Sequence, residues 1–206
     1  MSDSNQEVEA KFYVNDPDKI KARLPDLEAR LIQSRILETN IRFDLPDASL
    51  RSEGRVLRLR RDTESRLTYK GAGRNEQGVL SRTEIEFVVE DFDKARQFLE
   101  ALGYRELLSY DKYREVYELD ECHIMLDELP YGNFVEIEGK NAEAIQAVAA
   151  KLNLNWDAAI PRSYSALFDA VKKALNLSFQ NLSFENFAGI EMSPEHLGVT
   201  AADIDV

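Results

Sequence analysis

Charged side chains recur at every second position in several short segments of this chain. The first segment is Glu7-Val8-Glu9-Ala10-Lys11, in which two carboxylates and an ammonium group alternate with apolar residues. Successive side chains of a β-strand point to opposite faces, so Glu7, Glu9 and Lys11 are expected to share one face. Carboxylates bind hard cations and ammonium groups bind phosphate, so this face could form an ion-and-phosphate site. Alone, the pattern fits the solvated side of an ordinary sheet equally well.

The same alternation returns in later segments, with apolar residues between the charged ones. Together the segments place seven acids and seven bases on the charged face. The acids are Glu7, Glu9, Glu84, Glu86, Asp127, Glu136 and Glu138, and the bases are Lys11, Arg58, Arg60, Lys70, Arg82, Lys112 and Arg114. Buried ions are tolerated only with partners or a metal, so an enclosed face of this kind needs ligands. Acids for a divalent cation and bases for phosphate indicate a metal–polyphosphate substrate.

The hydrophobic pattern predicts the elements that carry these residues. We expect eight strand segments, near residues 6–14, 29–44, 55–62, 66–70, 81–90, 104–119, 121–127 and 133–138. Helices are expected after Asp16-Pro17, over residues 92–102, over 141–152 and from Pro161 to Leu175, and residues 71–78 are expected to form a loop. An open sheet with charged faces in water is one arrangement. The arrangement that also gives the helices an apolar surface to cover is a closed eight-stranded antiparallel β-barrel with helices outside, an α+β fold.

Composition limits the classes of partner. The 206 residues and 44% hydrophobic content suit one compact domain. A formal net charge of −12 argues against a nucleic-acid polymer or a membrane as a partner, while the local cluster of arginines suits a small polyanion. Cys122 is the one cysteine, and no signal peptide or apolar membrane span is evident, so a cytoplasmic location is expected.

The end of the chain differs in character. No Lys or Arg follows Lys173, while acids continue to Asp205. We expect residues 1–175 to form the domain and residues 176–206 to be an acidic tail, partly packed and partly mobile. Ser163-Tyr164 is expected to contact the domain through a helix surface, with tunnel lining as the alternative, and His123 is expected to be structural or exposed.

The ordered motifs resemble the CYTH superfamily, the triphosphate tunnel metalloenzymes. Glu7-Val8-Glu9-Ala10-Lys11 matches the ExExK signature, and the match continues through Arg58-Leu59-Arg60, Leu67-Thr68-Tyr69-Lys70, Glu84-Ile85-Glu86, Lys112-Tyr113-Arg114, Asp127 and Glu136-Ile137-Glu138. The resemblance runs from Glu7 to about Leu175. It implies a triphosphate substrate and dependence on Mg²⁺ or Mn²⁺. It also leaves open whether the protein forms a homodimer.

The resemblance also implies roles for the residues. Glu7, Glu9, Asp127, Glu136 and Glu138 are expected to bind metal, and Glu84 and Glu86 either join them or balance nearby bases. The bases expected to bind phosphate are Lys11, Arg58, Arg60, Lys70, Arg82, Lys112 and Arg114. Lys11, Glu9 and Glu136 are expected to be the catalytic residues.

Several functions remain open from the sequence. The pattern is most similar to class IV adenylate cyclases, which convert ATP to cyclic AMP and pyrophosphate. Hydrolysis of inorganic tripolyphosphate stands nearly level with it, and hydrolysis of thiamine triphosphate comes third. A non-catalytic module that binds polyphosphate or nucleotide is the alternative of a different class.

Overall fold

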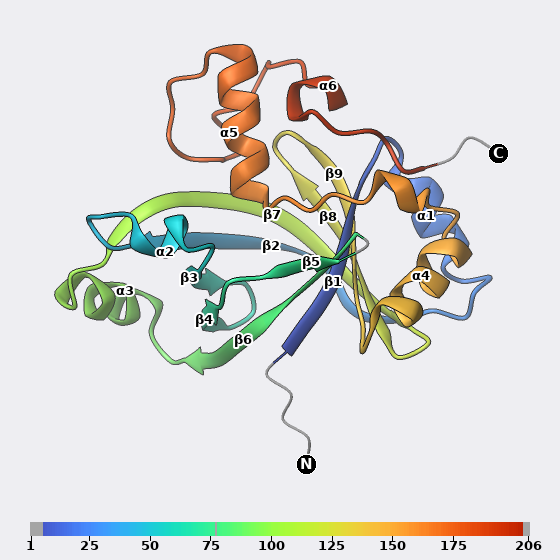
Figure 1. Cartoon of the computed structure of the whole chain (residues 1–206), viewed down its shortest axis with the longest axis horizontal. Coiled ribbons are helices and arrows are strands. Elements are labelled where there is room, and N and C mark those ends of the chain that lie inside the picture. The colour runs from blue at the N-terminus through green and yellow to red at the C-terminus, as the bar shows by residue number, and fades with distance from the viewer. Residues whose placement is uncertain (1–5, 77, 204–206) are drawn as a thin grey trace.

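The protein folds as a closed barrel with helices outside it. The computed structural model describes residues 6–76 and 78–203 (Figure 1). Eight antiparallel strands follow one another around the barrel in the order β1 (Gln6–Val14), β9 (Gly132–Glu138), β8 (Cys122–Leu129), β7 (Arg105–Leu119), β2 (Arg30–Asp44), β3 (Val56–Arg61), β4 (Ser65–Lys70) and β6 (Val79–Val89). β6 pairs with β1 and closes the ring. The predicted fold class is therefore confirmed.

A short additional strand corrects one expectation. β5 (Arg74–Glu76) lies in the segment predicted to be a loop, and it pairs with β6 beside the barrel. Its three residues are all exposed. Gly and polar residues around it gave no alternation of apolar and polar side chains, so sequence pattern could not reveal the strand.

The helices begin and end near the expected residues. α1 (Pro17–Arg23) is capped by Asp16, α3 (Phe92–Ala101) by Asp91, and α4 (Ala142–Lys151) by Asn141, each through its side-chain oxygen. Gly103, with φ of 93°, follows α3 and allows the chain to turn back. No helix within the described residues is long and apolar enough to span a membrane.

The helix expected from Pro161 starts three residues later. α5 (Tyr164–Leu175) begins after Ser163, whose hydroxyl accepts a hydrogen bond from the Ala166 N–H. Ser is a strong N-cap residue, so it sets the start in preference to the proline before it. Shorter helices complete the set: α2 (Ser49–Ser52), the 3-10 helix η1 (Trp156–Ala158) and α6 (Pro194–Leu197).

Apolar residues on the outer faces of the strands form the core beneath the helices. Phe12, Ile124 and Ile137 are fully buried against α1 and α4. On the far side of the barrel, Leu59 packs with Phe92 under α3. The inward-facing charges are thus separated from the hydrophobic core by the barrel wall, as the alternation predicted.

A third apolar cluster closes one end of the barrel. It joins α5 to the segment after it, through buried residues that include Leu167, Phe168, Leu182 and Phe187. The backbone of Leu182 hydrogen-bonds Ser109 and Asp111 of β7. Further on, the Asp203 carboxylate accepts from the backbone N–H of Asn15 and Asp16. Residues 176–203 therefore pack on the barrel, and the division into a domain and a tail stays a prediction.

Candidate functional site

The barrel encloses a cavity of about 550 Å³. Every site residue predicted from the sequence lines it except Asp127. Because neighbouring strands run in opposite directions, the start of β2 and the end of β7 meet at one end of the cavity. Residues 160–165 before and within α5 cover the other end, here called the closed end. The first end, where β2 starts and β7 ends, is here called the mouth, and it carries the exposed side chains of Ile32 and His123.

Glu7 is held between two bases. Its Oε1 lies 2.5 Å from Lys70 Nζ, and its Oε2 accepts a hydrogen bond of 2.8 Å from Arg82 Nε. Burial disfavours the charged carboxylate, but Lys70 and Arg82 outweigh it and lower the pKa of Glu7 to about 2. Glu7 is therefore a permanent anion, and it fixes the two bases in the tunnel wall.

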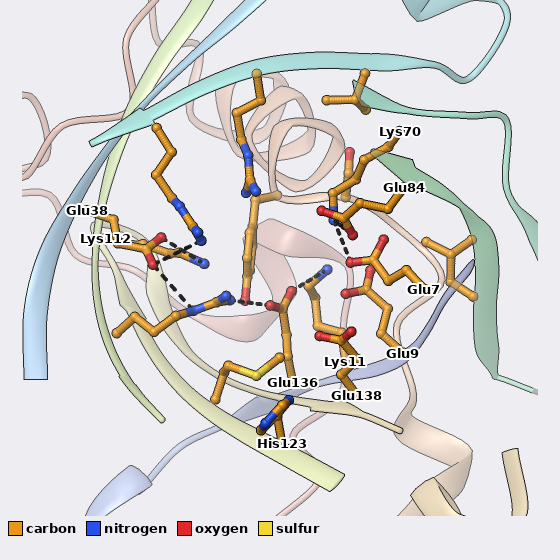
Figure 2. Close-up of a pocket in the computed structure, with 18 of the residues that line it drawn as sticks. Glu7, Glu9, Lys11, Glu38, Lys70, Glu84, Lys112, His123, Glu136 and Glu138 are labelled. Atoms are coloured by element: carbon orange, nitrogen blue, oxygen red, sulfur yellow. Dashed lines mark hydrogen bonds and ion pairs between the residues drawn. The ribbon is translucent and has the colours of Figure 1, made fainter. Parts of the chain in front are cut away.

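Three other carboxylates on the same side are less compensated. Burial, Glu136 and Glu7 raise the pKa of Glu9, and burial, Glu7 and Glu9 raise the pKa of Glu138 to about 7. Burial and Glu7 likewise raise the pKa of Glu84 to about 7, although Lys70 Nζ lies 3.2 Å away. Figure 2 shows Glu7, Glu9 and Glu84 together on one side of the tunnel. Negative charge is crowded here, and the four carboxylates of Glu7, Glu9, Glu84 and Glu138 are called the acidic wall.

Lys11 and Glu136 stand opposite each other on β1 and β9. Lys11 Nζ lies 3.0 Å from Glu136 Oε1, and Arg114 also pairs with Glu136. Burial opposes charge on both partners, but Glu136 and Glu9 raise the pKa of Lys11, and Lys11 and Arg114 hold the pKa of Glu136 well below its usual range. Both groups therefore remain charged at the centre of the tunnel.

Asp127 lies behind this pair, in the wall itself. It is 1% exposed, and Arg114 donates to it through Nε at 2.6 Å and Nη2 at 2.5 Å. Lys112 Nζ donates at 2.9 Å and the Tyr164 hydroxyl at 2.8 Å. Both carboxylate oxygens are thus engaged by donors. This arrangement orients Lys112 and Arg114 toward the cavity and suits a positioning role for Asp127.

A second group of acids orients the arginines on β3. Glu86 accepts from Thr68 Oγ1 at 2.7 Å and pairs with Arg58 at 3.4 Å and Arg60 at 3.3 Å. Burial opposes the charge, yet Arg60, Thr68 and Arg58 lower the pKa of Glu86. The contacts of Glu86 favour the balancing role that the sequence left open for it.

Glu38 was missed by the sequence analysis. It lies on β2, is 1% exposed, and stands 3.5 Å from Lys112 Nζ and 3.6 Å from Arg60 Nη1. Burial opposes its charge, but Lys112, Arg114 and Arg60 lower the pKa of Glu38 to about 2. Figure 2 shows Glu38 beside Lys112, across the tunnel from the acidic wall.

Arg42 and Tyr110 were also missed, although both line the cavity. Glu38, Asn40 and Arg42 occupy alternate positions of β2, which is the spacing that identified the other strands. The same reading applied to the second predicted strand would have found them. His123 lines the mouth and is exposed.

Tyr164 corrects the expectation that Ser163-Tyr164 makes only a helix surface contact, and it agrees with the alternative that this segment lines the tunnel. Its ring is 8% exposed and packs edge-on against Phe134, with Lys11 Nζ 4.4 Å from the ring centroid. Tyr131 donates its hydroxyl to the Tyr164 carbonyl at 2.9 Å. The first turn of α5 therefore closes the tunnel from within.

The acidic wall has the donor chemistry that suits Mg²⁺ or Mn²⁺. Carboxylate oxygens are the ligands these cations take, and a bound cation would relieve the crowding of negative charge at Glu7, Glu9 and Glu138. Within residues 6–76 and 78–203, no group of three or more His, Cys, Asp or Glu side chains converges closely enough to hold a metal ion. A cation bound here would require some carboxylates to turn from their bases toward it.

Two relatives align in sequence with most of this chain. A protein of Methanocaldococcus jannaschii named "Putative adenylate cyclase" is 30% identical over 172 residues, which cover 78% of this chain and 97% of the relative. An adenylate cyclase of Aeromonas hydrophila is 28% identical over 174 residues, covering 78% of this chain and 87% of the relative.

Solved structures share the fold. A Pyrococcus horikoshii protein superposes with a TM-score of 0.66 at 30% identity, covering 79% of this chain and 97% of that one. A Hippeastrum protein described as a "Putative adenylyl cyclase" with a dominant triphosphatase activity superposes with a TM-score of 0.61 at 18% identity, covering 80% of this chain and 95% of that one. The sequence pattern of the CYTH domain matches residues 5–164. The tunnel and its ordered charges are thus those of a CYTH domain, and the chain belongs to that family.

Proposed function

We propose that this protein is a divalent-metal-dependent enzyme that processes a triphosphate in the tunnel, with conversion of ATP to cyclic AMP and pyrophosphate as the first candidate reaction. The observation that supports this most is one cavity that holds seven predicted phosphate-binding bases next to an acidic wall. The two curated relatives are named as adenylate cyclases, which favours cyclisation over hydrolysis.

The bases act through position and charge. Arg60, Lys112 and Arg114 are oriented by Glu38 and Asp127, so their donors face the cavity before a substrate arrives. Transfer of a phosphoryl group needs alignment and neutralisation of charge more than covalent help from the protein. Lys11, held charged at the centre by Glu136, would neutralise a phosphate oxygen there.

Glu7, Glu9 and Glu138 of the acidic wall would hold the metal together with Glu136, and Glu84 lies beside them. A bound Mg²⁺ or Mn²⁺ would supply neutralisation of phosphate charge and a lower pKa for the attacking hydroxyl or water. The protein itself orients the phosphate chain and decides which phosphorus faces the nucleophile. In a cyclase that phosphorus is the α-phosphorus, attacked by the ribose 3′-oxygen as pyrophosphate leaves.

Hydrolysis of inorganic tripolyphosphate is the second candidate. The tyrosines that line the cavity, Tyr110 and Tyr164, are each 8% exposed, so neither offers an open ring face to an adenine base. A fully inorganic substrate needs no such face. Thiamine triphosphate hydrolysis and non-catalytic binding rank below these two candidates. A homodimer and a cytoplasmic location are separate proposals.

Product analysis separates these candidates. The purified protein is incubated with ATP, tripolyphosphate or thiamine triphosphate and Mg²⁺ or Mn²⁺, and the products are resolved by chromatography. Cyclic AMP with equimolar pyrophosphate establishes the cyclase. Orthophosphate and pyrophosphate from tripolyphosphate, without cyclic AMP from ATP, establish the hydrolase. If the protein binds these substrates measurably but forms no product from any of them, the result supports the non-catalytic binding module.

A further inference from the structure

Arg42 occupies a special position at the closed end of the tunnel. It lies near the end of β2, directly across from Arg58 on β3, and it lines the main cavity. Its guanidinium donates to the hydroxyl of Ser165 in the first turn of α5. Arg42 and Ser165 also line a smaller cavity of about 80 Å³ behind the tunnel.

Arg42 differs from the seven predicted phosphate-binding bases in its charge balance. Each of those bases has a carboxylate within ion-pair distance, as Lys70 has Glu7 and Lys112 has Asp127. Within the part of the chain that the structure describes, Arg42 has none; its Nε is buried without an acceptor, but so are those of Arg58 and Arg60, so the absent carboxylate is the difference. Burial lowers the pKa of Arg42, and nearby Arg51, Arg82 and Arg58 lower it further against a raising effect of Tyr110. The guanidinium is a partly buried cation without a carboxylate partner, and it can accept a counter-charge from a ligand in the cavity.

A neighbouring side chain also has unmet hydrogen bonds. Asn40 lies two residues before Arg42 on the same face of β2 and is 0% exposed. Neither its amide nitrogen nor its amide oxygen has a hydrogen-bond partner among the described residues. Asn40 does not line the cavity, so its unmet hydrogen bonds lie within the barrel wall, and of the two residues it is Arg42 that lines the cavity and can meet a ligand there.

A terminal phosphoryl group has the chemistry that would supply the counter-charge to Arg42. Such a group presents three oxygens and more negative charge than a bridging phosphate, and guanidinium groups bind it through two parallel hydrogen bonds. The N-terminus of α5, which is 12 residues long, adds positive potential at the same end. Glu7 and Glu9 of the acidic wall are both paired with Arg82, and no ion pair joins either of them to Arg42 in the described structure.

The mouth has the opposite character. Val116 and Met125 are paired neighbours on β7 and β8 and both face the cavity. Ile32, 43% exposed, lines the same end from β2. These are apolar positions on a face whose other residues are mostly charged, so they suit the organic part of a substrate better than a phosphate.

We propose that the tunnel binds its substrate in one direction, with the terminal phosphoryl group on Arg42 at the closed end and the organic group of a nucleoside triphosphate over Val116 and Met125 at the mouth. This inference rests on the proposed function, because it assigns the two ends of the same triphosphate site.

The test measures whether Arg42 senses the terminal phosphate. Binding of the α,β-methylene analogues of ATP and ADP is measured by calorimetry with Mg²⁺, for the wild type, Arg42→Gln and Arg42→Lys. The two ligands differ by the terminal phosphate, so the comparison isolates its coupling to Arg42. Arg42→Gln should weaken the ATP analogue by roughly tenfold to a hundredfold, the range of a charged hydrogen bond, and the ADP analogue by less than about threefold. Arg42→Lys should recover part of the loss.

A matched control removes one positive charge outside the tunnel. Arg96→Gln on α3 should change neither affinity, because Arg96 is 44% exposed and pairs only with surface acids in the described structure. Equal losses for both analogues in Arg42→Gln would overturn the proposal, since Arg42 would then serve another phosphate or the fold. No loss for either analogue would overturn it as well.

The mouth is tested separately. Met125→Gln should weaken the ATP analogue by about threefold or more and leave tripolyphosphate unchanged, because tripolyphosphate has no organic group. Equal weakening of both would contradict the assigned direction. If the wild type binds neither analogue nor tripolyphosphate with Mg²⁺ or Mn²⁺, the proposed function itself fails. A wrong direction, in contrast, leaves wild-type binding intact and changes only the pattern among variants.

Discussion

Glu9 of β1 and Glu138 of β9 are direct cross-strand partners, so two carboxylates face the tunnel side by side. Like charges directly opposite each other destabilise a sheet, and burial raises the cost. A fold that served stability alone would be better with a neutral or basic residue at one of these positions. A cation bound between the two strands, as in the proposed metal site, would offset this cost.

Glu138→Gln tests this explanation. Without metal, the variant should be more stable than the wild type, by about 1 kcal/mol, because one member of the repelling pair is removed. That corresponds to a rise of about 2–4 °C in Tm. With Mg²⁺ or Mn²⁺, the wild type should gain more stability than the variant, because the variant has lost a carboxylate ligand.

Differential scanning fluorimetry with and without metal measures both effects. Glu121→Gln is the matched control, since the Glu121 side chain is 81% exposed in a turn and pairs only with Lys140 among the described residues. A Glu138→Gln variant that is less stable without metal, or that gains as much from metal as the wild type, would contradict the metal assignment.

Glu9→Gln should abolish turnover while sparing the fold. Among the described residues Glu9 makes one ion pair, to Arg82 at 3.3 Å, and burial together with Glu136 and Glu7 raises its pKa. Losing the charge of Glu9 should cost little stability but remove a carboxylate from the acidic wall. We expect kcat to fall by about a hundredfold or more, with Tm unchanged or higher. Unfolding of the variant would show that Glu9 is a structural residue.

Asp127→Asn should behave in the opposite way. Asp127 is buried under Arg114, Lys112 and Tyr164, so neutralising it leaves buried cations short of a counter-charge. Such a change costs about 3–5 kcal/mol, which predicts a fall in Tm of about 6 °C or more. Thermal unfolding of Asp127→Asn beside Glu9→Gln measures the contrast. Equal stability of the two variants would place Asp127 with the metal-binding acids instead.

Leu182→Ala tests whether the C-terminal segment belongs to the folded unit. Leu182 is 0% exposed and its backbone pairs with β7. Truncation of a buried leucine costs about 2–5 kcal/mol, so Tm should fall by about 4 °C or more. Leu177→Ala, a half-exposed position in the same segment, serves as the comparison. No change in Tm for Leu182→Ala would support a tail that is independent of the domain.

The barrel and most of its lining could be predicted because charged and apolar residues alternate in the sequence with the period of two that is typical of β-strands. Glu7, Glu9 and Lys11 share a face in the sequence pattern and in the structure for the same reason. The alternation also predicted that helices would cover the outer faces, as α4 does over Ile137.

What the sequence could not show depends on contacts between distant elements. Tyr164 reaches Asp127 only because α5 packs across the end of the barrel, 37 residues away along the chain. β5 has no apolar alternation, and its pairing with β6 alone reveals it. The packed segment around Leu182 and Phe187 looked like a tail because its apolar residues are sparse and lack a regular period.

The central claim is that the charged tunnel binds a metal triphosphate. Calorimetric titration of the wild-type protein with tripolyphosphate, with and without Mg²⁺ and at two salt concentrations, tests it most directly. The account predicts saturable binding at one site, tighter with Mg²⁺ and weaker at high salt. Absence of binding under every one of these conditions, for ATP as well as tripolyphosphate, would contradict it.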